Sequence, residues 1–128
     1  MRNVIISRDK LTIFMRVSGF LDAAAVDEIT TEMRQAALTL GDAIGQHDFL
    51  FDLSGTNVAA QSAIDTLCRL LCDPQWQSRR ARRIAFFTPS ALLRLQLQRV
   101  CAARTGIAAF EDRKSAHDWL MQDRKVAA

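Results

Sequence analysis

Hydrophobic side chains recur at every second position over residues 11–18, where Leu11, Ile13, Met15 and Val17 alternate with Thr12, Phe14, Arg16 and Ser18. This period of two is typical of a strand with one buried face. The short run 3–7 before it is also β-prone, and the polar residues 8–10 connect the two runs. The N-terminal segment therefore predicts a β-hairpin.

The pattern then changes to helical spacing in four segments. The first follows Asp22, a good N-cap residue, and ends near Gly41. The second covers about residues 58–73, with Pro74 just beyond it. The third begins at residues 88–90 and closes at Gly106, and the fourth follows Asp112. Each segment carries one apolar stripe, so each predicts an amphipathic helix packed against a core.

Short unbroken apolar runs at residues 49–51, 84–87 and 107–110 separate these helices. The first two runs lie between turn signals and are typical of central strands that are covered on both faces, and the third predicts a last short strand. The element order is β-β-α-β-α-β-α-β-α, which predicts an α/β fold with a mostly parallel central sheet and helices packed against it. We expect one domain over residues 1–122 and a frayed C-terminal tail over 123–128.

Composition fits this picture. The chain has 128 residues, of which 49% are hydrophobic and 24% charged, as expected for one globular domain. No apolar run approaches the roughly 18 residues of a membrane span, and the start lacks the apolar core of a secretory leader. We therefore expect a cytoplasmic protein with free thiols. Neither the cysteines (Cys68, Cys72, Cys101) nor the histidines (His47, His117) have the spacing of a metal site, so we expect buried cysteines, no metal and no cofactor.

Charge is distributed unevenly along the chain. Residues 1–64 hold 5 basic and 8 acidic side chains, whereas residues 65–128 hold 12 and 6. The excess lies in the run Arg79, Arg80, Arg82 and Arg83, and on the third helix at Arg94, Arg99 and Arg104. These arginines predict one basic surface, which suits an acidic protein partner, a small anion or anionic lipid. The alternative for the run is a solvated loop that protects an apolar strand from aggregation.

An aromatic residue, Trp76, precedes the basic run and could stack on a nucleotide base. The other aromatic residues are mostly phenylalanines in the predicted strands rather than an exposed stacking platform, which disfavours nucleic acid as the partner.

Two motifs resemble a known family. Residues 16–24 read RVSGFLDAA, which resembles the strand-to-helix junction of STAS domains, and FLFDLSGT at 49–56 resembles their second hallmark. The element order also matches over nearly the whole chain, and the C-terminal part is similar to the SpoIIAA-like branch. The resemblance implies a non-enzymatic regulatory module that binds a partner protein or a nucleotide and is sometimes switched by phosphorylation.

In anti-sigma-factor antagonists of this family the phosphate acceptor is the first serine of D-S-S-G, at the start of the second helix. Counted from Asp52, that motif falls here on residues 60–63, where the acceptor position is Gln61 and only Ser62 keeps a hydroxyl. The resemblance therefore implies a lost or atypical switch, with Ser62 as the candidate phosphorylation site. The implied partner surface comprises Ser54, Gly55, Thr56, Asn57, Gln61 and Ser62.

Two alternatives remain open. One is a lipid or small-anion binding module, because the SpoIIAA-like branch resembles lipid-binding modules in topology. The other is an aspartyl phosphatase, since the stretch from Asp52 to Thr56 resembles the nucleophile motif of haloacid-dehalogenase phosphatases. The second aspartate of that motif is Ser54 here, and no lysine lies between Thr88 and Asp112. Without catalysis, Asp52 is expected to bond nearby backbone amides at the strand end.

Overall fold

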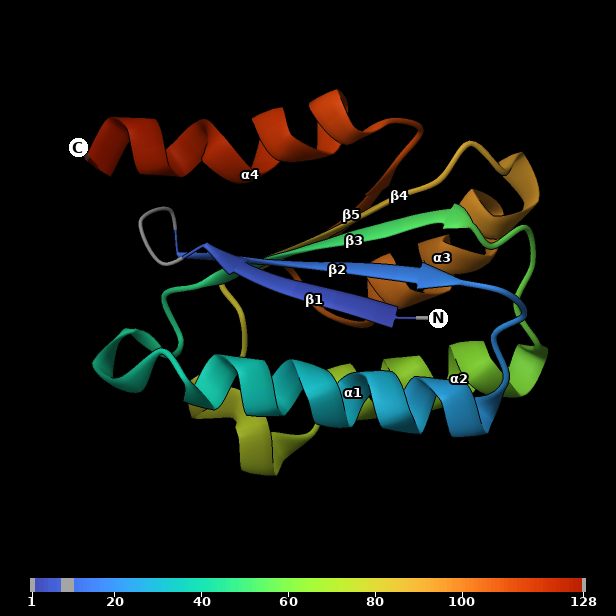
Figure 1. Cartoon of the computed structure of the whole chain (residues 1–128), viewed down its shortest axis with the longest axis horizontal. Coiled ribbons are helices and arrows are strands. Elements are labelled where there is room, and N and C mark those ends of the chain that lie inside the picture. Colours follow the sequence, from blue (N-terminus) through green and yellow to red (C-terminus); the bar gives the residue numbers. More distant parts are fainter. Residues whose placement is uncertain (1, 8–10, 128) are drawn as a thin grey trace.

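The computed structural model describes residues 2–7 and 11–127, with the side chains of residues 3–6 and 11–122. Its strands and helices follow the predicted order, with two short 3-10 helices, η1 and η2, added (Figure 1). The elements are β1 Arg2–Ser7, β2 Thr12–Ser18, α1 Ala23–Leu38, η1 Gly41–Ala43, β3 Asp48–Gly55, α2 Gln61–Leu71, η2 Pro74–Arg79, β4 Arg83–Phe87, α3 Ala91–Ala103, β5 Ile107–Phe110 and α4 Arg113–Ala127.

The five strands form one mixed sheet in the order β1-β2-β3-β4-β5. β1 and β2 pair antiparallel, as the predicted hairpin requires, and the other three pairings are parallel. The connecting residues 8–10, which the sequence assigned to a polar turn, lie outside the described residues. Because β2 to β5 run in the same direction, their carboxyl ends meet at one edge of the sheet, on the right of Figure 1.

Helices cover the sheet from both sides. Figure 1 shows α4 on one face and α1 and α2 on the other. Alternate residues of β3 serve the two layers: Phe49 and Phe51 join the large core under α1, α2 and α3, whereas Leu50 joins a smaller core under α4. Phe51 stacks on Phe86 of β4 with ring centroids 5.2 Å apart. The prediction that the apolar runs at 49–51 and 84–87 form strands buried on both faces is confirmed for β3 and β4. β5 is an edge strand in which only Ile107 is buried.

Element ends depart from the sequence prediction at three places. α1 ends at Leu38, before Gly41, where η1 begins. α2 begins at Gln61 rather than near residue 58, because backbone contacts hold residues 59 and 60 against Leu21. α4 continues past residue 122, where we expected a frayed tail to begin, and its backbone is helical to Ala127. Among the described residues, no helix is long and apolar enough to cross a membrane.

Candidate functional site

The two sequence motifs meet at the carboxyl edge of the sheet. The Gly19 amide donates to the Gly55 carbonyl over 3.0 Å. Leu21 bridges to Ala59, and the Ala60 amide donates to the Leu21 carbonyl over 2.8 Å. These contacts hold the end of β2 and the entry to α1 beside the segment that leads from β3 into α2.

This approach is so close that only glycine fits at position 55. A Cβ on Gly55 would lie 2.6 Å from Ser18 Cβ and 3.2 Å from Ser18 Cα. The pairing of β2 with β3 also shifts register here, between Arg16 and Ser18. The two motifs are separated in the sequence, but their backbones are in direct contact in the structure.

Five of the six predicted partner-surface residues are exposed at this edge: Ser54, Gly55, Asn57, Gln61 and Ser62. Thr56 is the exception, since its side chain is 1% exposed and its carbonyl accepts from Thr88 Oγ1. Ala60 is the N-cap of α2 and provides no side-chain hydrogen bond. Gln61 and Ser62, the first two residues of α2, therefore border a helix end that no side chain caps.

α3 holds the same segment from its other side. Ser90 Oγ donates to the Asn57 carbonyl over 2.6 Å. The Gln96 side-chain amide donates to the Ala59 carbonyl and accepts from the Ala59 amide, at 2.8 and 3.0 Å. Since these contacts join residues more than 30 positions apart, they fix the loop before α2 against the body of the domain.

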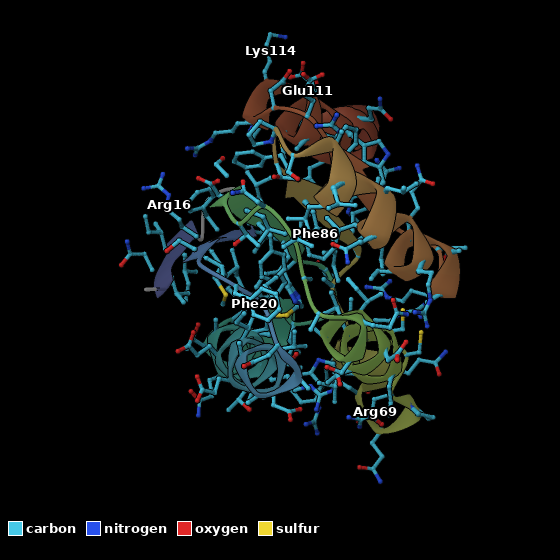
Figure 2. All side chains as sticks on the ribbon, turned by 90° about the vertical axis from the view of Figure 1, so that its right-hand side faces the viewer. Arg16, Phe20, Arg69, Phe86, Glu111 and Lys114 are labelled. Atoms are coloured by element: carbon cyan, nitrogen blue, oxygen red, sulfur yellow. The ribbon has the colours of Figure 1, made fainter. Side chains whose placement is uncertain are left out.

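Large apolar side chains lie exposed on both sides of this loop. Phe20, 63% exposed, lies between Gly19 and Leu21, which bond the loop. Figure 2 looks onto this end of the molecule and labels Phe20. On α3, Leu92 and Leu95 are 55% and 63% exposed, beside the bonding residues Ser90 and Gln96. The sequence motifs did not single out Phe20 as a surface residue. The sequence feature that could have identified Phe20 is its position as an aromatic residue at a strand-to-helix junction.

Asp52 is held in place at the same edge. Its carboxylate accepts from Arg16 Nε over 3.0 Å and from the Ser54 amide over 2.9 Å. Burial alone would raise the pKa of Asp52, but the hydrogen bonds from Ser54 and Arg16 outweigh it and lower that pKa below the usual value of 3.8. The structure thus gives Asp52 the backbone-bonding role that the sequence offered as the alternative to a nucleophile.

A groove lies on the α4 side of the sheet, next to Asp52. It encloses about 260 Å³ between β1, β2 and the first turns of α4. Ile5 and Phe14 form apolar parts of its lining, and Arg16, Arg113 and His117 provide polar groups. The guanidinium groups of Arg16 and Arg113 lie over the Phe14 ring, at 5.7 and 4.6 Å from its centroid. The groove therefore combines an apolar floor with positive charge.

Two of the four arginines of the basic run are turned inward. Arg82 binds the fully buried Asp48 carboxylate with two hydrogen bonds of 3.0 and 3.1 Å and also donates to the Leu120 carbonyl. Arg83 donates to the Trp119 carbonyl over 2.6 Å, and its guanidinium lies 4.7 Å from the Trp119 ring centroid. These two arginines attach α4 to the start of β3 and β4.

The remaining five arginines lie at two edges of the sheet, and Arg80 is half-buried at the end of η2, before β4. Arg79 lies over the Trp76 ring, and Arg104 donates to the Ala81 carbonyl, both near the start of β4. Arg94 donates to the Thr88 carbonyl at the opposite end of β4, and Arg99 pairs with Asp65 of α2 over 2.6 Å. The single basic face that we expected is thus divided between two edges of the sheet, and much of its charge is used within the domain.

The arrangement of the whole chain matches solved structures. No protein-family model and no curated protein matches the sequence. An uncharacterised protein of the DUF3478 family with a SpoIIAA-like fold, from Shewanella loihica PV-4, is 18% identical with a TM-score of 0.63, covering 94% of this chain and 92% of that one. The unphosphorylated anti-sigma factor antagonist SpoIIAA is 15% identical with a TM-score of 0.61, covering 95% and 97%. The chain has a SpoIIAA-like fold. The resemblance stated from the two motifs is confirmed for the fold.

Cysteines and histidines are dispersed within this SpoIIAA-like fold. Cys68 and Cys101 are half-buried, and burial raises the pKa of both thiols. Cys72 is exposed and bonds the Ala103 carbonyl, so the expectation that all three are buried is wrong for Cys72. His47 is buried, and its Nδ1 accepts from the Gly45 amide. In the described part of the chain, no three histidine, cysteine or acidic side chains are grouped so that they could hold a metal ion.

Proposed function

We propose that this chain is a non-enzymatic interaction module that binds a protein partner at the carboxyl edge of its sheet. The contact surface comprises Ser54, Gly55, Asn57, Gln61 and Ser62, with Phe20, Leu92 and Leu95 added as apolar anchors. The observation that carries the proposal is the exposure of these three large apolar side chains around one polar loop. Apolar anchors with a polar surround are typical of protein interfaces.

The fixed position of the loop supports the same proposal. Hydrogen bonds from both sides hold residues 55–60, so the surface is formed before a partner arrives. A preformed surface loses little conformational entropy on binding. SpoIIAA, which shares this fold, is an anti-sigma factor antagonist, and a regulatory role by partner binding is the function that the fold and surface together favour.

Ser62 is the candidate phosphorylation site in this proposal. Gln61 occupies the first position of α2 and carries no hydroxyl, whereas Ser62 is exposed beside it. A phosphate there would be stabilised by the free amides and the dipole of the helix start. We therefore propose that binding does not depend on a modification at position 61, and that the Ser62→Asp variant reports the effect of charge at this end.

The test is capture of partners with matched variants. Phe20→Ser should lower the amount of each protein recovered from native lysate, by about 30-fold in affinity if Phe20 acts as an interface anchor. Leu38→Ser is the matched control, because Leu38 is also exposed (54%) but lies at the far end of α1. Both variants should unfold at the wild-type temperature. Equal recovery with wild type, Phe20→Ser and Leu38→Ser would contradict the proposed surface.

A second candidate function rests on the groove beside α4. Its apolar floor and its two guanidinium groups suit a small amphiphilic carboxylate, since arginine binds carboxylates with two parallel hydrogen bonds. Arg16 is partly neutralised by Asp52, whereas Arg113 contacts the Phe14 ring and forms no ion pair with the described residues. Arg113 thus supplies most of the attraction for an anionic ligand.

Calorimetric titration with decanoate tests this second candidate. Arg113→Gln should weaken binding about tenfold, which corresponds to about 1.4 kcal/mol for one lost charged contact. Arg69→Gln makes the same charge change on the exposed last turn of α2, labelled in Figure 2, and should bind as the wild type does. Absence of binding to wild type, or equal affinities of the three proteins, excludes the groove as a carboxylate site.

A further inference from the structure

A small cavity lies at the other edge of the sheet, away from the proposed partner surface. It has a volume of about 20 Å³ and lies between α1, the end of α2, η2 and the starts of β3 and β4. α1 and η2 lie side by side there (Figure 1), and Arg34 of α1 lies over the Trp76 ring of η2 at 5.0 Å. About 10–15 Å³ is the least that holds a water molecule, so the cavity has room for one water-sized occupant.

Two residues that line the cavity each hold a buried hydrogen-bonding atom with no partner among the described residues. Thr30 is 3% exposed, and its Oγ1 is unpaired. Arg104 uses both terminal nitrogens, on the carbonyls of Thr105 and Ala81, but its buried Nε is unpaired. Leaving such groups unbonded costs free energy. Because a hydroxyl and an Nε–H can both donate, an occupant that accepts hydrogen bonds satisfies both.

The charge around the cavity is positive. Arg34, Arg80 and Arg104 reach it from three different elements, and no aspartate or glutamate of the described residues lines it. Asp73 offsets Arg34 from outside the lining, at 3.4 Å. Arg80 is half-buried and forms no ion pair within the described ranges. Burial, followed by the charge of Arg80, lowers the pKa of Arg104. Arg80 and Arg104 thus place two positive charges at a cavity whose lining contains no aspartate or glutamate of the described residues.

We propose that this cavity binds one small inorganic anion of the size of chloride. An anion accepts from Thr30 Oγ1 and from Arg104 Nε and offsets the charges of Arg80 and Arg104. A water molecule would leave the charges of Arg80 and Arg104 unbalanced. The anion joins α1, the end of α3 and the segment after η2, and it acts independently of the partner surface at the opposite edge.

Unfolding in chloride and in gluconate at equal pH and ionic strength tests the proposal, because gluconate is too large for the cavity. A ligand that binds only the folded state stabilises it by mass action. With a dissociation constant of about 1 mM, 0.1 M chloride lowers the unfolding equilibrium constant of the wild type about 100-fold relative to gluconate. Equal stability in both salts would overturn the proposal and leave water as the occupant.

Thr30→Val separates anion binding from general salt effects. Valine has nearly the shape of threonine and removes the unpaired hydroxyl, so in gluconate the variant should be at least as stable as the wild type. Chloride should lower the unfolding equilibrium constant of this variant, relative to gluconate, by a factor at least ten times smaller than for the wild type. Arg80→Gln should lose the chloride response in the same way, whereas Arg69→Gln, with the same charge change on exposed α2, should keep it. An unchanged chloride response in Thr30→Val and Arg80→Gln would refute the site.

Discussion

Arg82→Gln should lower the free energy of unfolding by about 3 kcal/mol or more, which is the usual cost of removing one partner from a buried ion pair. Asp48 is fully buried at the start of β3, and Arg82 gives its carboxylate two hydrogen bonds. The same guanidinium donates to the Leu120 carbonyl of α4 over 2.7 Å. Glutamine is too short to make these three contacts, so a buried charge loses its main counter-charge and α4 loses an attachment. Urea unfolding measures the change.

Arg99→Gln is the matched control for this prediction. Arg99 also pairs with an aspartate, at 2.6 Å, but both side chains are more than half exposed. Exposed pairs contribute about 0–1 kcal/mol, so this variant should remain within about 0.5 kcal/mol of the wild type. Replacing both buried partners, as Arg82→Met with Asp48→Leu, should recover much of the loss because no uncompensated charge remains. Equal costs for Arg82→Gln and Arg99→Gln would show that the Asp48 pair contributes little.

The fold could be predicted from the sequence wherever burial alone determines the structure. The alternation from Leu11 to Val17 and the unbroken runs around Phe49 and Ile84 mark buried faces directly, and these segments are the strands of the sheet. Element ends were less accurate where a distant contact decides them. α2 begins at Gln61 because Leu21, about 40 positions earlier, holds the backbone of residues 59 and 60. No local pattern encodes that contact.

The candidate site could likewise be predicted from the sequence only in part. Its motifs predicted which loop lies at the strand ends, and five of its six residues are exposed. Thr56 turns inward although its neighbours Gly55 and Asn57 are exposed. No pattern in the sequence indicated this. The sequence also predicted one basic face. This prediction was wrong because a run of arginines does not show which groups elsewhere in the chain bind them. Asp48, 34 positions before Arg82, and the carbonyls of α4 decide where those side chains point.

Gly55→Ala should destabilise the domain by about 1–3 kcal/mol, although β3 is extended at this position and alanine is otherwise tolerated there. The added methyl group would lie 2.6 Å from Ser18 Cβ and 3.2 Å from Ser18 Cα, both well inside contact distance. β2 and β3 would have to separate where the Gly19 amide bonds the Gly55 carbonyl. Because this contact positions the loop before α2, partner capture should fall together with stability.

A double-mutant cycle with Ser18→Gly identifies the cause of that loss. Ser18→Gly removes the Cβ that the new methyl group would meet first, and alone it should cost about 0.5–1 kcal/mol for a glycine in a strand. If the clash is the cause, the double variant should be more stable than the sum of the single changes predicts, by about 1 kcal/mol. Urea unfolding of the four proteins measures this coupling. Strictly additive costs would mean that position 55 requires glycine for another reason, and that the direct contact between the two motifs does not set the geometry of the loop before α2.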